Sequence, residues 1–205
     1  MVRRSRKRFV IPAVERDRLV MFSDGVFAIV VTLLVLEIGT GDGAAWHDFQ
    51  AAIPELGLFA WSFFLVARFW QLHVRLFGAL KDKIPGDFMD INSVLLFFVA
   101  LLPFATKFFG DHFHQSVAFA VYAAVIGMIG LVQARIRSLI ITQIKDDDSE
   151  EAQAVHDALP FVVIPIIMAI SIPAAFLSPT IGYILWGGAI LVNIVRGVIT
   201  NKKEV

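Results

Sequence analysis

Cysteine is missing from this chain of 205 residues, and charged side chains are scarce. The missing thiols exclude disulfides, thiolate metal sites and cysteine nucleophiles. Only 18% of the residues are charged and 58% are apolar, whereas soluble domains carry about 25% charged and about 45–50% apolar residues. The mean hydropathy of +0.74 therefore disfavours a soluble domain, a disordered chain and a nucleic-acid binder.

Six apolar stretches divide the chain, and each is close to the length of about 20 residues that a membrane-spanning helix needs. We therefore predict an all-α integral membrane protein, with one six-helix domain over residues 1–205. Arg68 interrupts the second stretch, and prolines interrupt the fifth, which neighbouring helices tolerate in a membrane. The predicted spans are about 19–38, 53–77, 88–109, 117–144, 158–177 and 181–199.

The basic residues alternate between the connections of these spans. Lysine and arginine are enriched in cytoplasmic segments. They gather in the N-terminal tail, after the second span, after the fourth span and at the C-terminal end. Of the 18 basic residues, only Arg68 and Lys107 depart from this pattern. The alternation predicts that both termini are cytoplasmic.

Polar side chains inside the predicted spans gather near the cytoplasmic face. With a rise of about 1.5 Å per residue, Asp24 lies about 8–10 Å along the first span, and His73 lies at a similar depth in the second. A hydrogen-bonded network there either gates the first helix or clamps it structurally, and a proton relay through Asp24 and His73 is a further interpretation. The residues that can share this layer are Arg18, Ser23, Asp24, Trp70, His73 and Asn92.

The first span also carries an apolar line. At about 100° per residue, Ile29, Leu33 and Leu36 lie within about 60° of one another, and Asp24 points about 140° away from Ile29. Gly25 and Thr32 flank the line. Composition and spacing alone favour contact of this line with lipid or ordinary packing.

Two motifs resemble a known family. Residues 18–25 form an R-x-x-x-F-S-D-G string, and residues 70–77 form a W-x-x-H-x-R-L-F string. Both are similar to the transmembrane protein 175 family, which comprises endosomal and lysosomal potassium channels and their prokaryotic relatives. A looser likeness runs from Asn92 to Pro103, so the resemblance covers about half of the chain, its first three spans.

The resemblance implies a prokaryotic homotetramer of six-helix subunits without a re-entrant pore loop. It implies that the first helices line the pore, with the constriction at Ile29, further apolar rings at Leu33 and Leu36, and Thr32 close to the passing ions. We place the motif residues Phe22 and Gly25 with the polar network. Glu37 lies at the outer mouth or is an ordinary charge at the membrane interface.

These observations predict a potassium-permeable cation channel in the prokaryotic plasma membrane rather than an enzyme. A proton-coupled carrier or an intramembrane enzyme that uses Asp24 and His73 is the alternative, and a purely structural membrane subunit is a third. The expected partners are further copies of the chain and the lipid bilayer, with no nucleic acid and no small-molecule substrate. We expect no cofactor and no resident metal, only potassium as the permeant ion.

Overall fold

Helices make up nearly all of the part of the chain that the computed structural model describes, which is residues 14–39, 43–80, 83–84, 86–144, 155 and 163–188. The helices are α1 (Arg16–Leu36), α2 (Ala45–Gly78), α3 (Asp87–Ala100), α4 (Leu102–Asp111), α5 (Ser116–Gln143) and α7 (Val163–Leu177). Residues 179–188 are helical as well.

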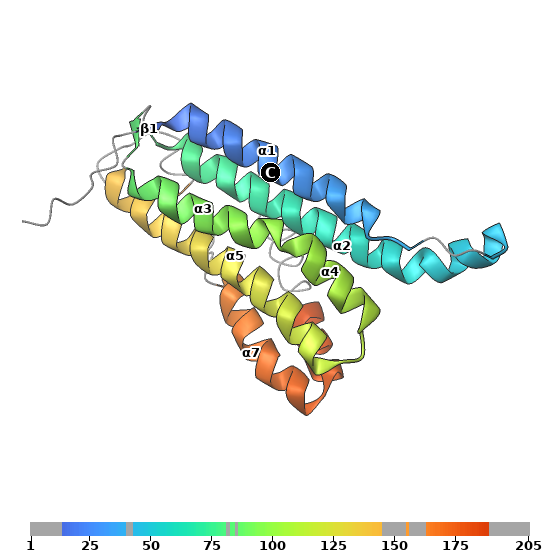
Figure 1. Cartoon of the computed structure of the whole chain (residues 1–205). Coiled ribbons are helices and arrows are strands. Elements are labelled where there is room, and N and C mark those ends of the chain that lie inside the picture. Colours follow the sequence, from blue (N-terminus) through green and yellow to red (C-terminus); the bar gives the residue numbers. More distant parts are fainter. Residues whose placement is uncertain are drawn as a thin grey trace, which may run out of the picture.

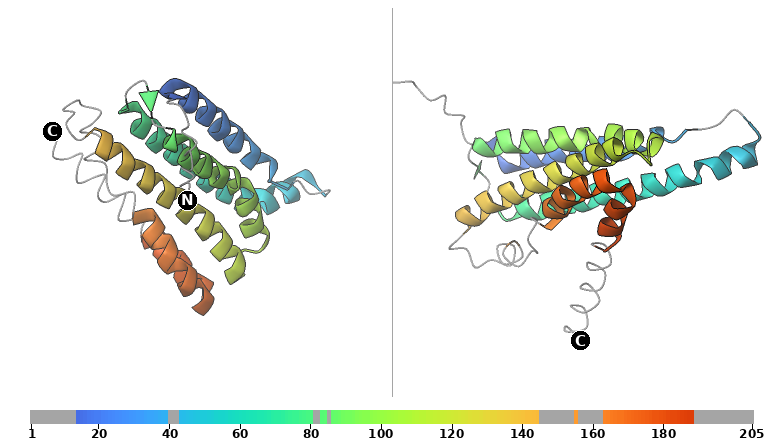
Figure 2. Two further views of the ribbon diagram at one scale, coloured as in Figure 1. Left: turned by 60° about the vertical axis from the view of Figure 1, so that its left-hand side comes forward. Right: turned by 90° about the horizontal axis from the view of Figure 1, so that it is seen from below.

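Helix α5 lies at the centre of the bundle, and α1 lies at its edge (Figures 1 and 2). α5 contacts α2, α3 and α4 on one side and packs along α7 on another. α1 contacts α2, α3 and α4. Because these neighbours meet only one face of α1, its other face is left uncovered within the described chain.

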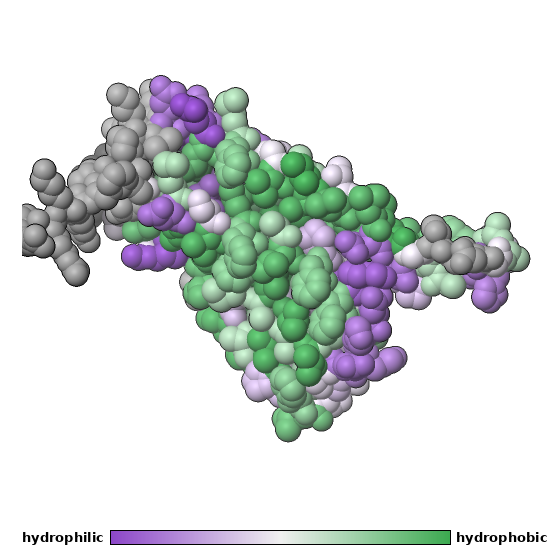
Figure 3. Space-filling model, in the orientation of Figure 1, coloured by the Kyte–Doolittle hydropathy of each residue, from purple (hydrophilic) through white to green (hydrophobic). Residues whose placement is uncertain are grey.

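Four helical stretches among the described residues are long and apolar enough to cross a bilayer: Arg16–Leu36, Ala45–Gly78, Phe88–Asp111 and Ser116–Gln143. The face seen in Figure 3 is apolar over the middle of the bundle, and hydrophilic residues gather toward its ends. α7 is shorter, with 15 residues. Parts of the predicted fifth and sixth spans, and both termini, lie outside the described residues.

Helix α2 is longer than its apolar run. It has 34 residues and begins at Ala45, not near 53 as predicted. The added turns mix Trp46 and Phe49 with polar residues, so hydropathy misses them. Asp48 lies in the first turn and accepts a hydrogen bond from the backbone N–H of Gly43 at 2.8 Å, which favours a helix start there. A straight helix of this length, about 51 Å, exceeds the bilayer's hydrocarbon core of about 30 Å.

The third predicted span is divided into two helices. α3 ends and α4 begins on either side of Leu101, and the chain bends there (Figure 1). Pro103 lies in the first turn of α4. Since proline has no N–H, the carbonyl of Val99 loses its helical donor, and the proline ring crowds the preceding turn.

A short strand pair is the part of the fold that the all-α prediction missed. β1 (Val14–Glu15) pairs with β2 (Lys83–Ile84) in antiparallel fashion, with Val14 opposite Ile84. Next to the pair, Arg16 Nη1 donates a hydrogen bond to the carbonyl of Leu80 at 2.8 Å. The pair therefore joins the chain before α1 to the connection between α2 and α3.

An aromatic core fills the bundle near the turn between α4 and α5. The rings of Phe109 and Tyr122 stack with centroids 5.0 Å apart, and those of Phe119 and Trp186 stack at 4.3 Å. All four side chains are buried. Since Trp186 belongs to the helix at 179–188, these contacts join that helix to α4 and α5.

Replacing Gly182 with alanine is expected to destabilise this core. The added Cβ would lie 2.5 Å from Cζ of Phe119, a fully buried ring with no space to retreat. Such overpacking costs about 1–3 kcal/mol. The thermal midpoint of the purified protein should fall for Gly182→Ala. It should stay or rise for Gly188→Ala, where nothing lies within 4 Å of the added atom; equal midpoints for the two variants would contradict the packing argument.

Candidate functional site

Helix α1 has two faces of different character. Its buried residues recur every three or four positions and pack against α2, α3 and α4. They are Leu19, Ser23, Phe27, Val30 and Leu34. On the other side the side chains of Ile29, Leu33 and Leu36 are 60%, 41% and 75% exposed. The apolar line of α1, defined as these three residues, is therefore uncovered within one subunit.

A buried hydrogen-bonded chain joins the three helices near the strand-pair end. Asn92 Nδ2 on α3 donates to Ser23 Oγ on α1 at 2.9 Å, and Ser23 Oγ donates to the carbonyl of Leu19 at 2.8 Å. Asn92 Oδ1 lies 2.9 Å from Nε2 of His73 on α2. The three side chains are almost fully buried, with at most 2% of any of them exposed. One asparagine thus links α1 to α2.

The direction of these bonds sets the tautomer of His73. Because the amide nitrogen of Asn92 faces Ser23, its carbonyl oxygen faces His73, and Nε2 of the ring must donate. The ring also stacks on Phe77 with centroids 4.4 Å apart. Nδ1 is buried and has no hydrogen-bond partner among the described residues. A neutral ring with its proton on Nε2 satisfies this arrangement.

Asp24 and Trp70 form a separate contact at the margin of this layer. Trp70 Nε1 donates to Asp24 Oδ1 at 2.8 Å, which again joins α2 to α1. Trp70 is exposed and Asp24 is partly exposed. In the described structure Asp24 bonds to Trp70 and His73 to Asn92, and no hydrogen bond joins Asp24 to His73 directly.

Three further motif residues face outward from the subunit. Arg18, Phe22 and Gly25 are exposed, and the side chain of Arg18 makes no hydrogen bond or ion pair with the described residues. At about 100° per residue they lie on the side of α1 that carries Ile29. Depth along the helix predicts that Arg18 joins the polar layer, and the motif predicts Phe22 and Gly25 there too. The direction of all three residues on the helix takes them away from that layer.

Thr32 lies on the uncovered side of α1, and its hydroxyl is bound to its own helix. Oγ1 donates to the carbonyl of Ile29 at 2.8 Å. Since that bond uses the hydroxyl proton, the lone pairs of Oγ1 remain available as acceptors on the exposed surface. Thr32 therefore presents hydroxyl lone pairs next to an otherwise apolar line.

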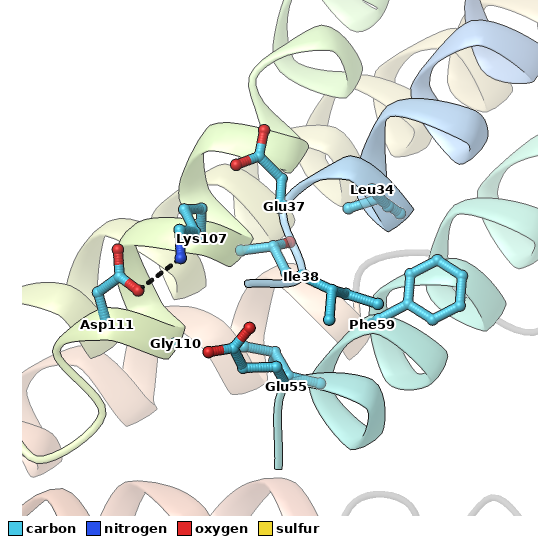
Figure 4. A pocket seen from close by; sticks show the side chains of 10 residues that line it. Leu34, Glu37, Ile38, Glu55, Phe59, Lys107, Gly110 and Asp111 are labelled. Carbon is cyan, nitrogen blue, oxygen red and sulfur yellow. Dashed lines mark hydrogen bonds and ion pairs between the residues drawn. The ribbon is translucent and has the colours of Figure 1, made fainter. Parts of the chain in front are cut away.

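The opposite end of α1 meets a charged cluster (Figure 4). Glu37 follows the last turn of α1 and lines a cavity of about 20 Å³ together with Glu55, Lys107 and Asp111. Lys107 Nζ lies 2.9 Å from Asp111 Oδ1, and Glu55 Oε2 accepts the backbone N–H of Gly39 at 2.7 Å. Lys107, which broke the pattern of basic residues, thus has a local acidic partner.

Sequence reasoning missed two groups of polar residues. Glu55 escaped notice because it lies at the margin of the second apolar run. Ser62, Thr106 and Tyr122 form a buried cluster, in which Ser62 Oγ lies 2.9 Å from the tyrosine hydroxyl and Thr106 donates to Ser62 at 3.1 Å. Single hydroxyl residues in long apolar runs were the available signal, but their partners come from other helices.

Among the described residues, no group of three or more His, Asp or Glu side chains is placed to hold a metal ion.

Comparisons with known proteins find similarity to potassium channels. The family described as Endosomal/lysosomal potassium channel TMEM175 matches residues 18–103. A potassium channel of Chryseobacterium sp. is 32% identical over 171 residues, which cover 81% of this chain and 85% of that protein. A potassium channel of Streptomyces collinus is 32% identical over 124 residues, 58% of this chain and 60% of that protein. The crystal structure of a lysosomal potassium-selective channel TMEM175 homolog from Chamaesiphon minutus is similar with a TM-score of 0.70 at 25% identity, covering 91% of this chain and 98% of that chain.

Proposed function

Since the chain belongs to the TMEM175 family of potassium channels, we propose that four copies of it form a pore lined by α1 and conduct potassium. The chain is an integral membrane protein, and its function is ion conduction rather than catalysis. We further propose six spans, both termini in the cytoplasm and a place in the plasma membrane of a prokaryote.

The uncovered apolar line of α1 is the observation that carries this proposal. A helix at the edge of a bundle can turn such a line to lipid or to a symmetry axis. The motif residue Gly25 lies on the same side as Ile29, and so does the hydroxyl of Thr32 with its free lone pairs. An axis that the four copies of α1 share accounts for both the apolar and the polar members of this side.

Around such an axis, Ile29 would form the constriction. Four isoleucine side chains offer no oxygen to replace the water around an ion, so a narrow ring closes the pore by dewetting. Leu33 and Leu36 would add apolar rings further out. Potassium gives up its water more readily than sodium, which favours potassium at such a ring, and the free lone pairs of Thr32 lie beside it.

The two ends of α1 would be held differently. Near the cytoplasmic face, Ser23 and Asp24 connect α1 to α2 and α3 through three further side chains, those of Trp70, His73 and Asn92. At the outer end, Glu55 binds the backbone after α1 at Gly39. This charged cluster contains three carboxylates, Glu37, Glu55 and Asp111, and one ammonium group, Lys107. It therefore carries a net negative charge that attracts cations. The alternative of a carrier or enzyme at Asp24 and His73 gains no support, because these two side chains bind different partners.

Potassium flux through reconstituted protein tests the proposal. We expect liposomes that contain the purified tetramer to take up potassium under a gradient faster than empty liposomes, and faster than they take up sodium. A tracer or a potassium-sensitive dye measures both rates. The proposal fails if folded tetramers of the native protein and of an Ile29→Ser variant both leave potassium flux at the level of empty liposomes, since the second cannot be held closed by isoleucine.

A further inference from the structure

A second hollow lies beside the charged cluster of Glu37, Glu55, Lys107 and Asp111, between α2, α4 and the helix at 179–188. It has a volume of about 550 Å³, within the range of about 300–1,000 Å³ typical of small-molecule sites. α2 lines it with residues 54–61, α4 and its following turn with Phe109 and Phe113, and the helix at 179–188 with Tyr183 and Trp186. We call it the aromatic groove.

The walls of the aromatic groove are largely aromatic, and two of the rings are held by contacts with each other. The rings of Phe113 and Tyr183 stack at 4.9 Å, and Tyr183 donates its hydroxyl hydrogen to the carbonyl of Phe113. Trp61 lines the groove from α2, and Trp186 is buried against the aromatic core. Aromatic faces attract cations, most strongly where water is excluded.

Among the residues that line the groove, one is charged, Glu55, which also lines the neighbouring cavity. Oε2 is bound to Gly39, and Oε1 has no hydrogen-bond partner among the described residues. Glu37 and Asp111 lie beyond it in the neighbouring cavity, where Lys107 is already paired with Asp111. The field at this end of the groove is therefore negative.

From this combination we infer that the aromatic groove binds a small organic ammonium ion that carries apolar substituents. A bare inorganic cation would lose its water to walls that cannot replace it. A neutral acyl chain would bring hydrocarbon against the Glu55 end of the groove, where three carboxylates outnumber the one ammonium group of Lys107, and this is also costly. An ammonium ion with alkyl groups satisfies the rings and the carboxylate together.

Binding of tetrabutylammonium to the tetramer tests this inference without any ion flux, so the result does not depend on the proposed channel function. The protein is placed in nanodiscs of phosphatidylglycerol, a lipid without an amine, and titrated calorimetrically. We expect saturable binding of one ion per chain. Glu55→Gln keeps an acceptor for Gly39 and removes the charge, and it should weaken binding about tenfold or more, because the bound cation loses the one charged residue of the lining.

Two further variants locate the site. Glu37→Gln removes a charge from the neighbouring cavity only and should change the affinity less than Glu55→Gln does. Gly187→Leu fills the groove from a position with nothing within 4 Å of an added Cβ, and it should abolish binding without lowering the thermal midpoint. Binding that survives both Glu55→Gln and Gly187→Leu lies elsewhere and overturns the inference. Loss of binding when phosphatidylethanolamine replaces the phosphatidylglycerol would overturn the free ion as occupant and assign the groove to a lipid headgroup.

Discussion

Replacing Ile29 with serine is expected to raise potassium flux and to reduce the preference for potassium over sodium. In the proposed tetramer this change replaces four apolar side chains at one level with four hydroxyls. Water then occupies the constriction at all times, and ions pass without a dewetting barrier. Every reduction of about 1.4 kcal/mol in that barrier raises the rate about tenfold. Even a partial loss of the barrier should therefore raise potassium flux by about an order of magnitude.

Val35→Ser is the matched control for Ile29→Ser. Val35 is also an exposed aliphatic residue of α1, 47% exposed against 60% for Ile29. At about 100° per residue it points about 120° away from Ile29, so it should leave flux and selectivity nearly unchanged. Liposome flux for both ions, measured at equal amounts of tetramer, compares the two variants. Equal increases from both would place the constriction elsewhere, and no increase from Ile29→Ser would remove Ile29 from it.

Sequence reasoning identified the family because its signals are local. The R-x-x-x-F-S-D-G string lies within residues 18–25, and the resemblance that it carries is confirmed by the family match and by the relatives. Rise per residue brought Ser23, His73 and Asn92 to one depth, and hydrogen bonds do join them. The role of this layer, and that of Ile29, stay predictions.

Features that depend on packing between helices were not accessible in this way. Depth along a helix says nothing of direction, so Arg18 was grouped with side chains from which it points away. Glu55 matters because α1 ends beside it, and Ser62 matters because α4 and α5 bring Thr106 and Tyr122 to it. No periodicity in the sequence indicates which side chains of different helices come into contact. The bend at Leu101 was foreseeable from Pro103, but hydropathy alone averages over it.

The largest loss of stability is expected for Asn92→Leu. Leucine has a similar volume but no polar atoms. The Ser23 hydroxyl oxygen therefore loses the hydrogen bond from Asn92, and the Nε2 proton of His73 loses its acceptor. Both groups are almost fully buried, and no lipid can satisfy them. Each lost bond costs about 1–3 kcal/mol in protein interiors and less in membrane proteins, whose unfolded chains also find partners. We expect about 1–4 kcal/mol in total.

Thermal unfolding of the purified tetramer measures this loss, and Ser93→Ala serves as its control. Ser93 follows Asn92 on α3, but it is exposed and its hydroxyl donates to the carbonyl of Met89 in its own helix, so its removal should cost less than about 0.5 kcal/mol. A leucine variant as stable as the control would show that the chain from Ser23 to His73 does not hold α1 in place. Since Asn92 joins α1 to α2 through buried side chains, a destabilised but assembled leucine variant should also conduct differently from the native protein. That second effect separates an anchor for the pore helix from a bond that only stabilises the fold.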